Sequence, residues 1–287
     1  MHTTLVECVP NFSEGRDPAK IEAITEAIRS AGAAVLDRSS DPDHHRSVVT
    51  FAAPADRAGE AAFRAVRQAV ASLDLRSHAG VHPRIGAADV VPFVPLRGVT
   101  LAECAAIAQQ TGRRIWEELR VPVYLYEAAA LRPECRNLAD IRRGAVPLPD
   151  FGGPALHPSA GSVVVGARKF LIAFNVNLQT SDVAIARRIA RAVRFSSGGL
   201  PYVKAMGVLL ASSNLAQVSM NLTDFEQTPI PVAFEAVRAQ AAHYGVAIAG
   251  SEIVGLVPRK ALDPEAASHL QLENFGPRSI LENLLED

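Results

Sequence analysis

The chain has 287 residues, of which 48% are hydrophobic and 21% charged. This composition is that of an ordinary globular protein and excludes disordered or fibrous chains. The formal net charge is −1 at pH 7, and only 6% of the residues are aromatic. No global field or basic aromatic stripe favours nucleic acid or an anionic membrane, so we expect small-molecule partners.

The cysteines and the apolar runs favour a cytoplasmic protein. Cys8, Cys104 and Cys135 are widely spaced and form no C-x-x-C pair, which argues against a disulfide framework or a zinc site. No apolar run approaches the ~20 residues that span a bilayer. The segment from Met1 to Pro10 lacks the basic and apolar regions of a signal peptide, so we expect none.

The first half of the chain predicts an α/β unit. Asp17 and Pro18 form a helix start, because Asp caps free amides and Pro fits the first turn. Ile21, Ile24 and Ile28 follow with helical spacing. The expected elements are a strand at Leu5 to Val9, a helix from Asp17 to Gly32, strands at Ala33 to Asp37 and Ser47 to Phe51, a helix from Pro54 to Ser72, and a strand at Ala88 to Val94. This β-α-β-β-α-β order favours an antiparallel sheet with helices on one face.

The second half repeats this order. Its expected elements are a strand at Lys169 to Asn175, a helix from Ser181, paired strands at Val203 to Ala211 and Ala216 to Leu222, a helix from Thr228 to Gly245, and a strand at Val246 to Val254. We therefore predict an α/β (α+β) fold of two ferredoxin-like βαββαβ subdomains, residues 1–178 and 179–287.

The region between the two halves is less regular. A helix is expected from Leu101 to Leu119 and a strand from Val121 to Tyr126. The stretch from Arg132 to Gly161 is rich in proline and glycine. A long irregular segment of this kind is typical of either a linker or part of a site.

The richest polar cluster runs from Arg76 to Asp89 and contains two histidines and two arginines. Its glycines permit close backbone approach, and His82 titrates near neutrality, so it can take and return a proton. The alternative is a turn whose histidines bond backbone carbonyls. His78 and His82 have the spacing of helical metal ligands, but Gly80 and Pro83 argue against a helix, so we predict no metal there.

Two further segments offer polar groups. The stretch from Asp37 to Arg46 holds carboxylates and imidazoles of the kind that bind metals, but we adopt the simpler interpretation of a solvated loop between two strands. The stretch from Gly161 to Lys169 resembles an anion cradle, whose amides and two cations suit carboxylates or phosphates. A strand start with solvated charges is an equal alternative.

Several segments together resemble the formiminotransferase domain family, in family order and along nearly the whole chain. They are Val6 to Arg16, His82 to Ala87, Val121 to Tyr126, Gly166 to Asn177, Asn214 to Ser219, and Gly250 to Pro258. The resemblance implies transfer of a formimino group from N-formimino-L-glutamate to N5 of tetrahydrofolate, as co-substrate. It also implies two α/β subdomains with a folate-binding cleft between them, and a homodimer. A folate-dependent formyl-group transferase and a non-catalytic folate-binding protein remain alternatives.

The resemblance also assigns site residues. His82 matches the catalytic histidine of the family, and we expect Arg84, Arg168 and Lys169 to hold carboxylates of glutamate or of the folate tail. No metal is expected. The folate-binding segment is identified as Gly161, Ser162, Val163, Val164, Val165, Gly166, Ala167, Arg168, Lys169 and Phe170. Further candidates are Asn11, Asp37, Ser39 and His45. Some members of the family carry Asp where Ser39 stands, and His45 replaces an Asn before Arg46.

Overall fold

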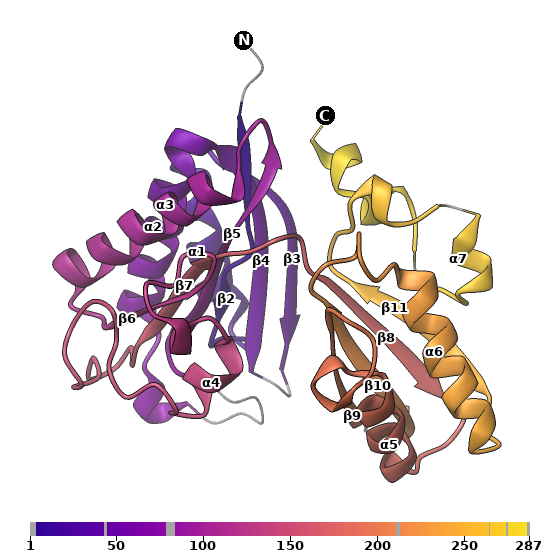
Figure 1. Cartoon of the computed structure of the whole chain (residues 1–287). Helices are drawn as coiled ribbons and strands as arrows, with labels where there is room; N and C mark the ends of the chain where they lie inside the picture. Colours follow the sequence, from indigo (N-terminus) through magenta and orange to yellow (C-terminus); the bar gives the residue numbers. More distant parts are fainter. Residues whose placement is uncertain are drawn as a thin grey trace. The chain divides into compact units, whose positions relative to one another are not determined.

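The computed structural model describes residues 4–42, 45–78, 84–210, 213–263, 265–273 and 275–285. The chain divides into two compact units, Met1–Lys169 and Phe170–Asp287, both drawn in Figure 1. Strand β8 (Ile172–Leu178) pairs with two strands of the second unit. The division therefore comes before the predicted boundary at 178. None of the helices in the described ranges combines the length and the hydropathy of a membrane span.

The described part of the first unit is built on a seven-stranded sheet. Its strands are β1 (Leu5–Cys8), β2 (Asn11–Phe12), β3 (Ala34–Asp41), β4 (Arg46–Pro54), β5 (Ala88–Arg97), β6 (Val123–Glu127) and β7 (Val163–Ala167). β1 and β2 both lie between β4 and β5, and Pro10, which has no N–H, falls in the gap between them. β3 pairs with β4. β7 and then β6 extend the sheet beyond β5 as parallel strands.

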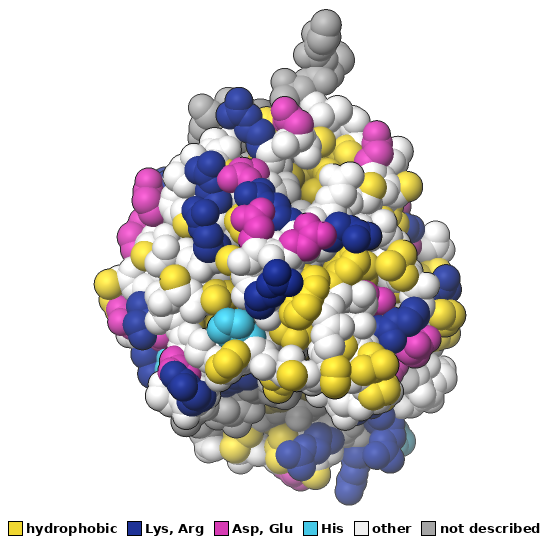
Figure 2. Space-filling view, turned by 90° about the vertical axis from the view of Figure 1, so that its left-hand side faces the viewer, with side chains coloured by type: hydrophobic (Ala, Val, Ile, Leu, Met, Phe, Trp, Pro, Cys, Tyr) yellow, Lys and Arg dark blue, Asp and Glu magenta, His cyan; other side chains and the backbone are white. Residues whose placement is uncertain are grey.

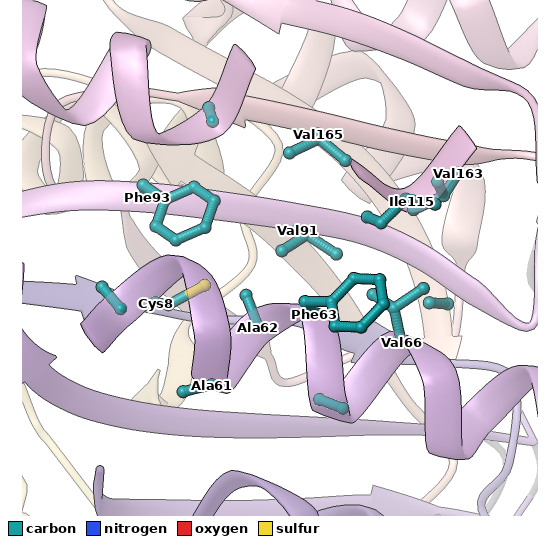
Figure 3. Close-up of a cluster of buried hydrophobic side chains, with 14 of the residues drawn as sticks. Cys8, Ala61, Ala62, Phe63, Val66, Val91, Phe93, Ile115, Val163 and Val165 are labelled. Atoms are coloured by element: carbon teal, nitrogen blue, oxygen red, sulfur yellow. The ribbon is translucent and has the colours of Figure 1, made fainter. Parts of the chain in front are cut away.

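Helices cover one face of this sheet. They are α1 (Pro18–Arg29), α2 (Ala55–Ser72) and α3 (Leu101–Arg114), the last continued by a π-helical turn at Ile115–Leu119. Asp17 caps α1 as predicted, by accepting from the amides of Ala19 and Lys20. Figure 3 shows Phe63 and Val66 of α2 facing Val91 of β5 in the core between the layers. Full burial of a side chain such as Phe63 contributes about 1.5–3 kcal/mol.

The opposite face of β5, β6 and β7 carries a smaller core. It includes Val90, Val164 and Tyr126 of the sheet, packed with Ile141 and Val146. Ile141 belongs to the short helix α4 (Leu138–Arg142), which follows a 3₁₀ turn at Pro133–Cys135. The irregular stretch that begins at residue 132 is therefore packed on the sheet rather than acting as a free linker.

The second unit has the predicted order of elements. These are β8, α5 (Val183–Val193), β9 (Val203–Leu210), β10 (Leu215–Leu222), α6 (Ile230–His243) and β11 (Ile248–Val254). Its described strands form an antiparallel sheet in the order β11-β8-β10-β9. This arrangement is compatible with a ferredoxin-like subdomain. A short helix, α7 (Ala266–His269), follows.

Glu7 is a carboxylic acid inside the first unit. It lies on β1 opposite Ala52 and Val94, and its side chain is buried. Burial raises the pKa of Glu7 from 4.5 to about 7, and the positive charge of Arg168 opposes part of that rise. Between pH 4.5 and about 7 the folded chain therefore binds more protons here than the unfolded chain.

Replacing Gly166 of β7 by alanine should destabilise the first unit. A Cβ there would lie 2.3 Å from Cδ1 of Tyr126 and 2.5 Å from its carbonyl oxygen. Overpacking of this kind costs about 1–3 kcal/mol. We expect a lower urea midpoint for Gly166→Ala, followed by circular dichroism. The control is Gly153→Ala, because a Cβ at Gly153 would meet nothing within 4 Å. Equal midpoints for the two variants would contradict the packing described.

Glu7→Gln should change the pH dependence of stability. The unfolding free energy of the wild type is expected to fall as pH rises from 4.5 to about 7, since the buried acid must ionise. The glutamine variant has no such proton to lose. The two proteins should unfold alike near about pH 4.5, and the variant should be more stable near about pH 8. Urea titrations at both pH values test this, and a wild type that is no less stable than the variant near pH 8 would refute it.

Candidate active site

One end of the first sheet gathers polar segments that are far apart in the sequence. β2 ends there and β4 begins there, because the two strands pair antiparallel. β5 and β7 also begin there, because β2 is antiparallel to β5 and β7 is parallel to it. A cavity of about 860 Å³ adjoins this end. Its described lining residues are Leu75, Arg76, His78, Arg84, Ile85, Tyr124, Ile141, Arg142, Gly144, Val146, Leu156, His157, Pro158, Gly161 and Ser162.

The segment that leads into β5 is fixed by backbone hydrogen bonds on both sides. The amide of Ser162 donates to the carbonyl of Ile85 (2.9 Å), and the amide of Ser13 donates to the carbonyl of Ala87 (2.8 Å). Between these bonds, a Cβ at Gly86 would lie 1.7 Å from the carbonyl oxygen of Ser162. Glycine is therefore required at residue 86, where two strand starts meet at backbone contact distance.

Asp89 is a buried carboxylate among arginines. Its Oδ1 accepts from the amide of Ile85 (2.9 Å), and its Oδ2 accepts from Nη2 of Arg142 on α4. Burial lowers the pKa of Arg46 to about 10; Asp89 opposes this, while the positive charges of Arg142 and Arg84 add to it. The site is therefore cationic, and Asp89 compensates part of that charge.

Two histidines pack against each other beside this cluster. The ring centroids of His45 and His78 are 3.9 Å apart, and Nη1 of Arg84 lies 2.7 Å from Nε2 of His78. Nδ1 of His45 accepts from the amide of Gly15 (3.2 Å) and lies 3.4 Å from Oε1 of Glu14.

Burial lowers the pKa of both histidines below 6.5. For His45, the carboxylate of Glu14 opposes burial without cancelling it. For His78, the positive charge of Arg84 adds to the effect of burial. Both rings are therefore mainly neutral at pH 7, the form that accepts a proton.

The structure brings some of the predicted site residues together. Arg84, Gly161 and Ser162 line the cavity, and His45 contacts His78, which also lines it. Asn11 lies at the same end of the sheet, where its Oδ1 accepts from Nη2 of Arg46. His82 lies outside the described residues, in the stretch 79–83. Both His78 and Arg84, which flank that stretch, line the cavity.

Other predicted residues lie elsewhere. Asp37 and Ser39 are on β3, opposite Thr50 and Val48 of β4. Neither belongs to the described lining of the cavity. Val163–Ala167 is the buried strand β7, and its backbone pairs with β5 and β6 on both sides. The expected anion-cradle loop is thus a strand over these five residues, and their amides bond within the sheet.

Arg168 and Lys169 follow the far end of β7. Because a strand rises about 3.3 Å per residue, the five residues of β7 that separate Gly161 and Ser162 from Arg168 span on the order of 13 Å. Phe170 begins the second unit, where its ring packs edge-on against Phe225 with centroids 6.4 Å apart.

Tyr124, Arg142 and His157 line the cavity but were missed by the sequence analysis. The last two belong to the irregular stretch from 132 to 161, whose length was a signal of a site but did not single out a residue.

The stretch around Asp37 was considered for metal ligands and rejected. Among the residues that the structure describes, no group of three or more His, Cys, Asp or Glu is placed to hold a metal.

His45→Asn should flatten the acid dependence of stability. A folded-state pKa below 6.5 means that the unfolded chain binds more protons, so the unfolding free energy falls as pH drops below about 6.5. Asparagine has no proton to gain there, and it tolerates the left-handed backbone of residue 45 (φ 49°). Thermal midpoints between about pH 7.5 and 5 should fall less for the variant than for the wild type. Exposed His243 supplies the control, His243→Asn, and identical slopes for all three proteins would refute the expectation.

The chain matches known proteins along almost its entire length. The family described as "Formiminotransferase domain, N-terminal subdomain" matches residues 5–168, and "Formiminotransferase domain" matches residues 173–281. The chain is 46% identical to glutamate formimidoyltransferase of Thermoplasma acidophilum, over 99% of this chain and 98% of the relative. It is 45% identical to glutamate formimidoyltransferase of Streptococcus pyogenes serotype M1, over 98% of each chain.

A larger relative matches as well. The chain is 44% identical to formimidoyltransferase-cyclodeaminase of Rattus norvegicus, over 94% of this chain and 53% of the relative. Both family descriptions and all three relatives agree with the resemblance carried by the sequence segments. The chain belongs to the formiminotransferase domain family.

Proposed function

We propose that this chain is a glutamate formimidoyltransferase. It moves the formimino group of N-formimino-L-glutamate to N5 of tetrahydrofolate, and it yields 5-formiminotetrahydrofolate and L-glutamate. The observation that carries the proposal is the 46% identity to a glutamate formimidoyltransferase over 99% of this chain. The cavity of the first unit supports it, since arginines and histidines beside apolar side chains suit anionic, partly aromatic substrates.

The reaction requires two proton movements at one carbon. N5 of the pterin attacks the formimino carbon and forms a new C–N bond. The tetrahedral intermediate then carries both the incoming and the departing nitrogen. The incoming nitrogen loses a proton, the departing glutamate nitrogen gains one, and the bond to glutamate breaks. One histidine can act first as base and then as acid, so the protons balance without a further group.

We assign this proton transfer to His82. His78 and Arg84, which flank the stretch 79–83 in the sequence, both line the cavity, and burial lowers the pKa of His78. A cation and a proton acceptor at this cavity support the assignment. Arg84, Gly161 and Ser162 are assigned to substrate binding at this end of the sheet. Arg168 and Lys169, which follow the other end of β7, are assigned to a different part of the substrates. Holding both substrates in one site removes much of the entropic barrier.

The proposed function also implies an oligomeric state and a cellular location. We infer a homodimer that acts in the cytoplasm on small molecules. On the face drawn in Figure 2, basic and acidic side chains of the described residues lie intermingled. Mixed charge of this kind is typical of a solvated surface and does not concentrate a nucleic-acid backbone or anionic lipid.

His82→Ala should abolish most of the transfer and leave folate binding nearly intact. Loss of a general acid–base group lowers kcat by about 10²–10⁴-fold. Formation of 5-formiminotetrahydrofolate is followed by absorbance, and tetrahydrofolate binding by calorimetry. The control His243→Ala changes an exposed histidine at the end of α6 and should keep full turnover. Unchanged turnover in His82→Ala would remove His82 from the mechanism.

The same assay separates the alternative functions. Purified protein is given tetrahydrofolate with either N-formimino-L-glutamate or N-formyl-L-glutamate. Turnover with the formimino donor supports the proposal. Turnover with the formyl donor alone would replace it by formyl transfer, and tight folate binding with neither turnover would indicate a binding protein.

A further inference from the structure

We propose that the cavity of the first unit binds the two carboxylates of an L-glutamyl group, and that Arg142 of α4 grips one of them. This rests on the proposed function, because both of its substrates carry such a group: the formimino donor and the tail of tetrahydrofolate. The shared chemistry is a dicarboxylate whose two carboxylates are joined by the Cα methine and two methylenes.

The charge of the lining favours a dianion. Arg76, Arg84 and Arg142 line the cavity, and the described lining includes no carboxylate. The acids that pair with this set act from outside the lining: Asp74 bonds Arg76, and Asp89 bonds Arg142. Arg142, whose side chain is 19% exposed, and half-buried Arg84 place positive charge in a partly desolvated space, where charge-assisted hydrogen bonds are strong. Arg76 is 70% exposed and adds less.

Arg142 is oriented before any ligand arrives. Its side chain is 19% exposed, and the Oδ2 atom of Asp89 accepts from one of its terminal nitrogens, Nη2. A guanidinium has five N–H donors in a fixed plane, so one bond to Asp89 sets the direction of the others. The Nε of Arg142 is buried and has no hydrogen-bond partner among the described residues. Such an unsatisfied donor is rare in native proteins. Because Arg142 lines the cavity and its side chain is partly exposed, its terminal N–H groups that do not bond Asp89 are the donors assigned to a bound carboxylate.

The remaining lining fits the rest of a glutamyl group. Nδ1 of His157 accepts from the amide of Ala160 (3.1 Å), so the neutral ring carries its proton on Nε2 as a donor. Tyr124, Ile141 and Val146 supply apolar surface for methylenes. A volume of about 860 Å³ exceeds the need of one glutamyl group and leaves space for an attached aminobenzoyl ring.

Arg142→Met tests the assignment, because methionine keeps the aliphatic length without the charge. Its matched control is Arg143→Met: Arg143 is the next residue, its side chain is 71% exposed, and it pairs with Asp140. The single variant strands the buried carboxylate of Asp89, so the double variant Asp89→Asn/Arg142→Met removes both charges together. Circular dichroism establishes that each variant is folded.

The direct readout is calorimetric binding of p-aminobenzoyl-L-glutamate and of N-formimino-L-glutamate, with p-aminobenzoate as the probe that lacks a glutamyl group. We expect Arg142→Met and the double variant to bind at least one glutamyl probe about tenfold or more weakly than the wild type. Arg143→Met should bind both probes like the wild type. Folded Arg142 variants that bind both glutamyl probes with wild-type affinity would overturn the proposal.

Kinetics distinguish the two sources of the glutamyl group. A raised KM for N-formimino-L-glutamate alone assigns the cavity to the donor. A raised KM for tetrahydrofolate, with no change for tetrahydropteroate, assigns it to the folate tail. Binding of the probes is measured without turnover, so the two proposals can fail separately. If the wild type binds glutamyl probes through Arg142 but transfers no formimino group, the proposed function is refuted and the glutamyl-binding site stands.

Discussion

The polar end of the first sheet depends on the buried carboxylate of Asp89. This side chain accepts a hydrogen bond from the amide of Ile85, which belongs to the segment leading into β5. It also forms an ion pair with the guanidinium of Arg142 on α4. It thereby joins a strand start to a helix 53 positions later in the chain. Removing one partner of a buried ion pair costs about 3–5 kcal/mol, because the other charge is left without compensation. The negative charge of Asp89 therefore stabilises the group of arginines around it.

Burial raises the free energy of the charged arginines, and it also keeps the histidines neutral. Arg46, Arg84 and Arg142 lie close enough for their charges to act on one another, and burial and neighbouring cations both disfavour protonation of His78. A neutral imidazole beside fixed positive charge combines a proton acceptor with anion recognition. Acid–base chemistry on an anionic substrate needs these two properties together.

Local patterns in the sequence predicted most helices and strands. Strand β7 and part of the cavity could be recognised only from the tertiary structure. Asp17 and the isoleucines after it define a helix on their own, and the cluster from Arg76 to Asp89 was visible because its polar groups are adjacent. At Val163–Ala167 the sequence left an anion cradle and a strand start as equal alternatives, because a strand buried on both faces has no alternating pattern. Arg142 and His157 were missed because folding alone brings their irregular segment to Arg84.

The position of β7 in the sheet has a consequence for the order of folding. β6 precedes β7 in the chain, yet β7 lies between β5 and β6. In the described structure, β6 pairs within the sheet through β7. During synthesis, the segment that contains β6 and α4 must therefore wait until residues 163–167 have emerged from the ribosome. The cavity that α4 helps to line is then among the last features of the first unit to assemble, and a chain interrupted before β7 would lose the site along with the strand.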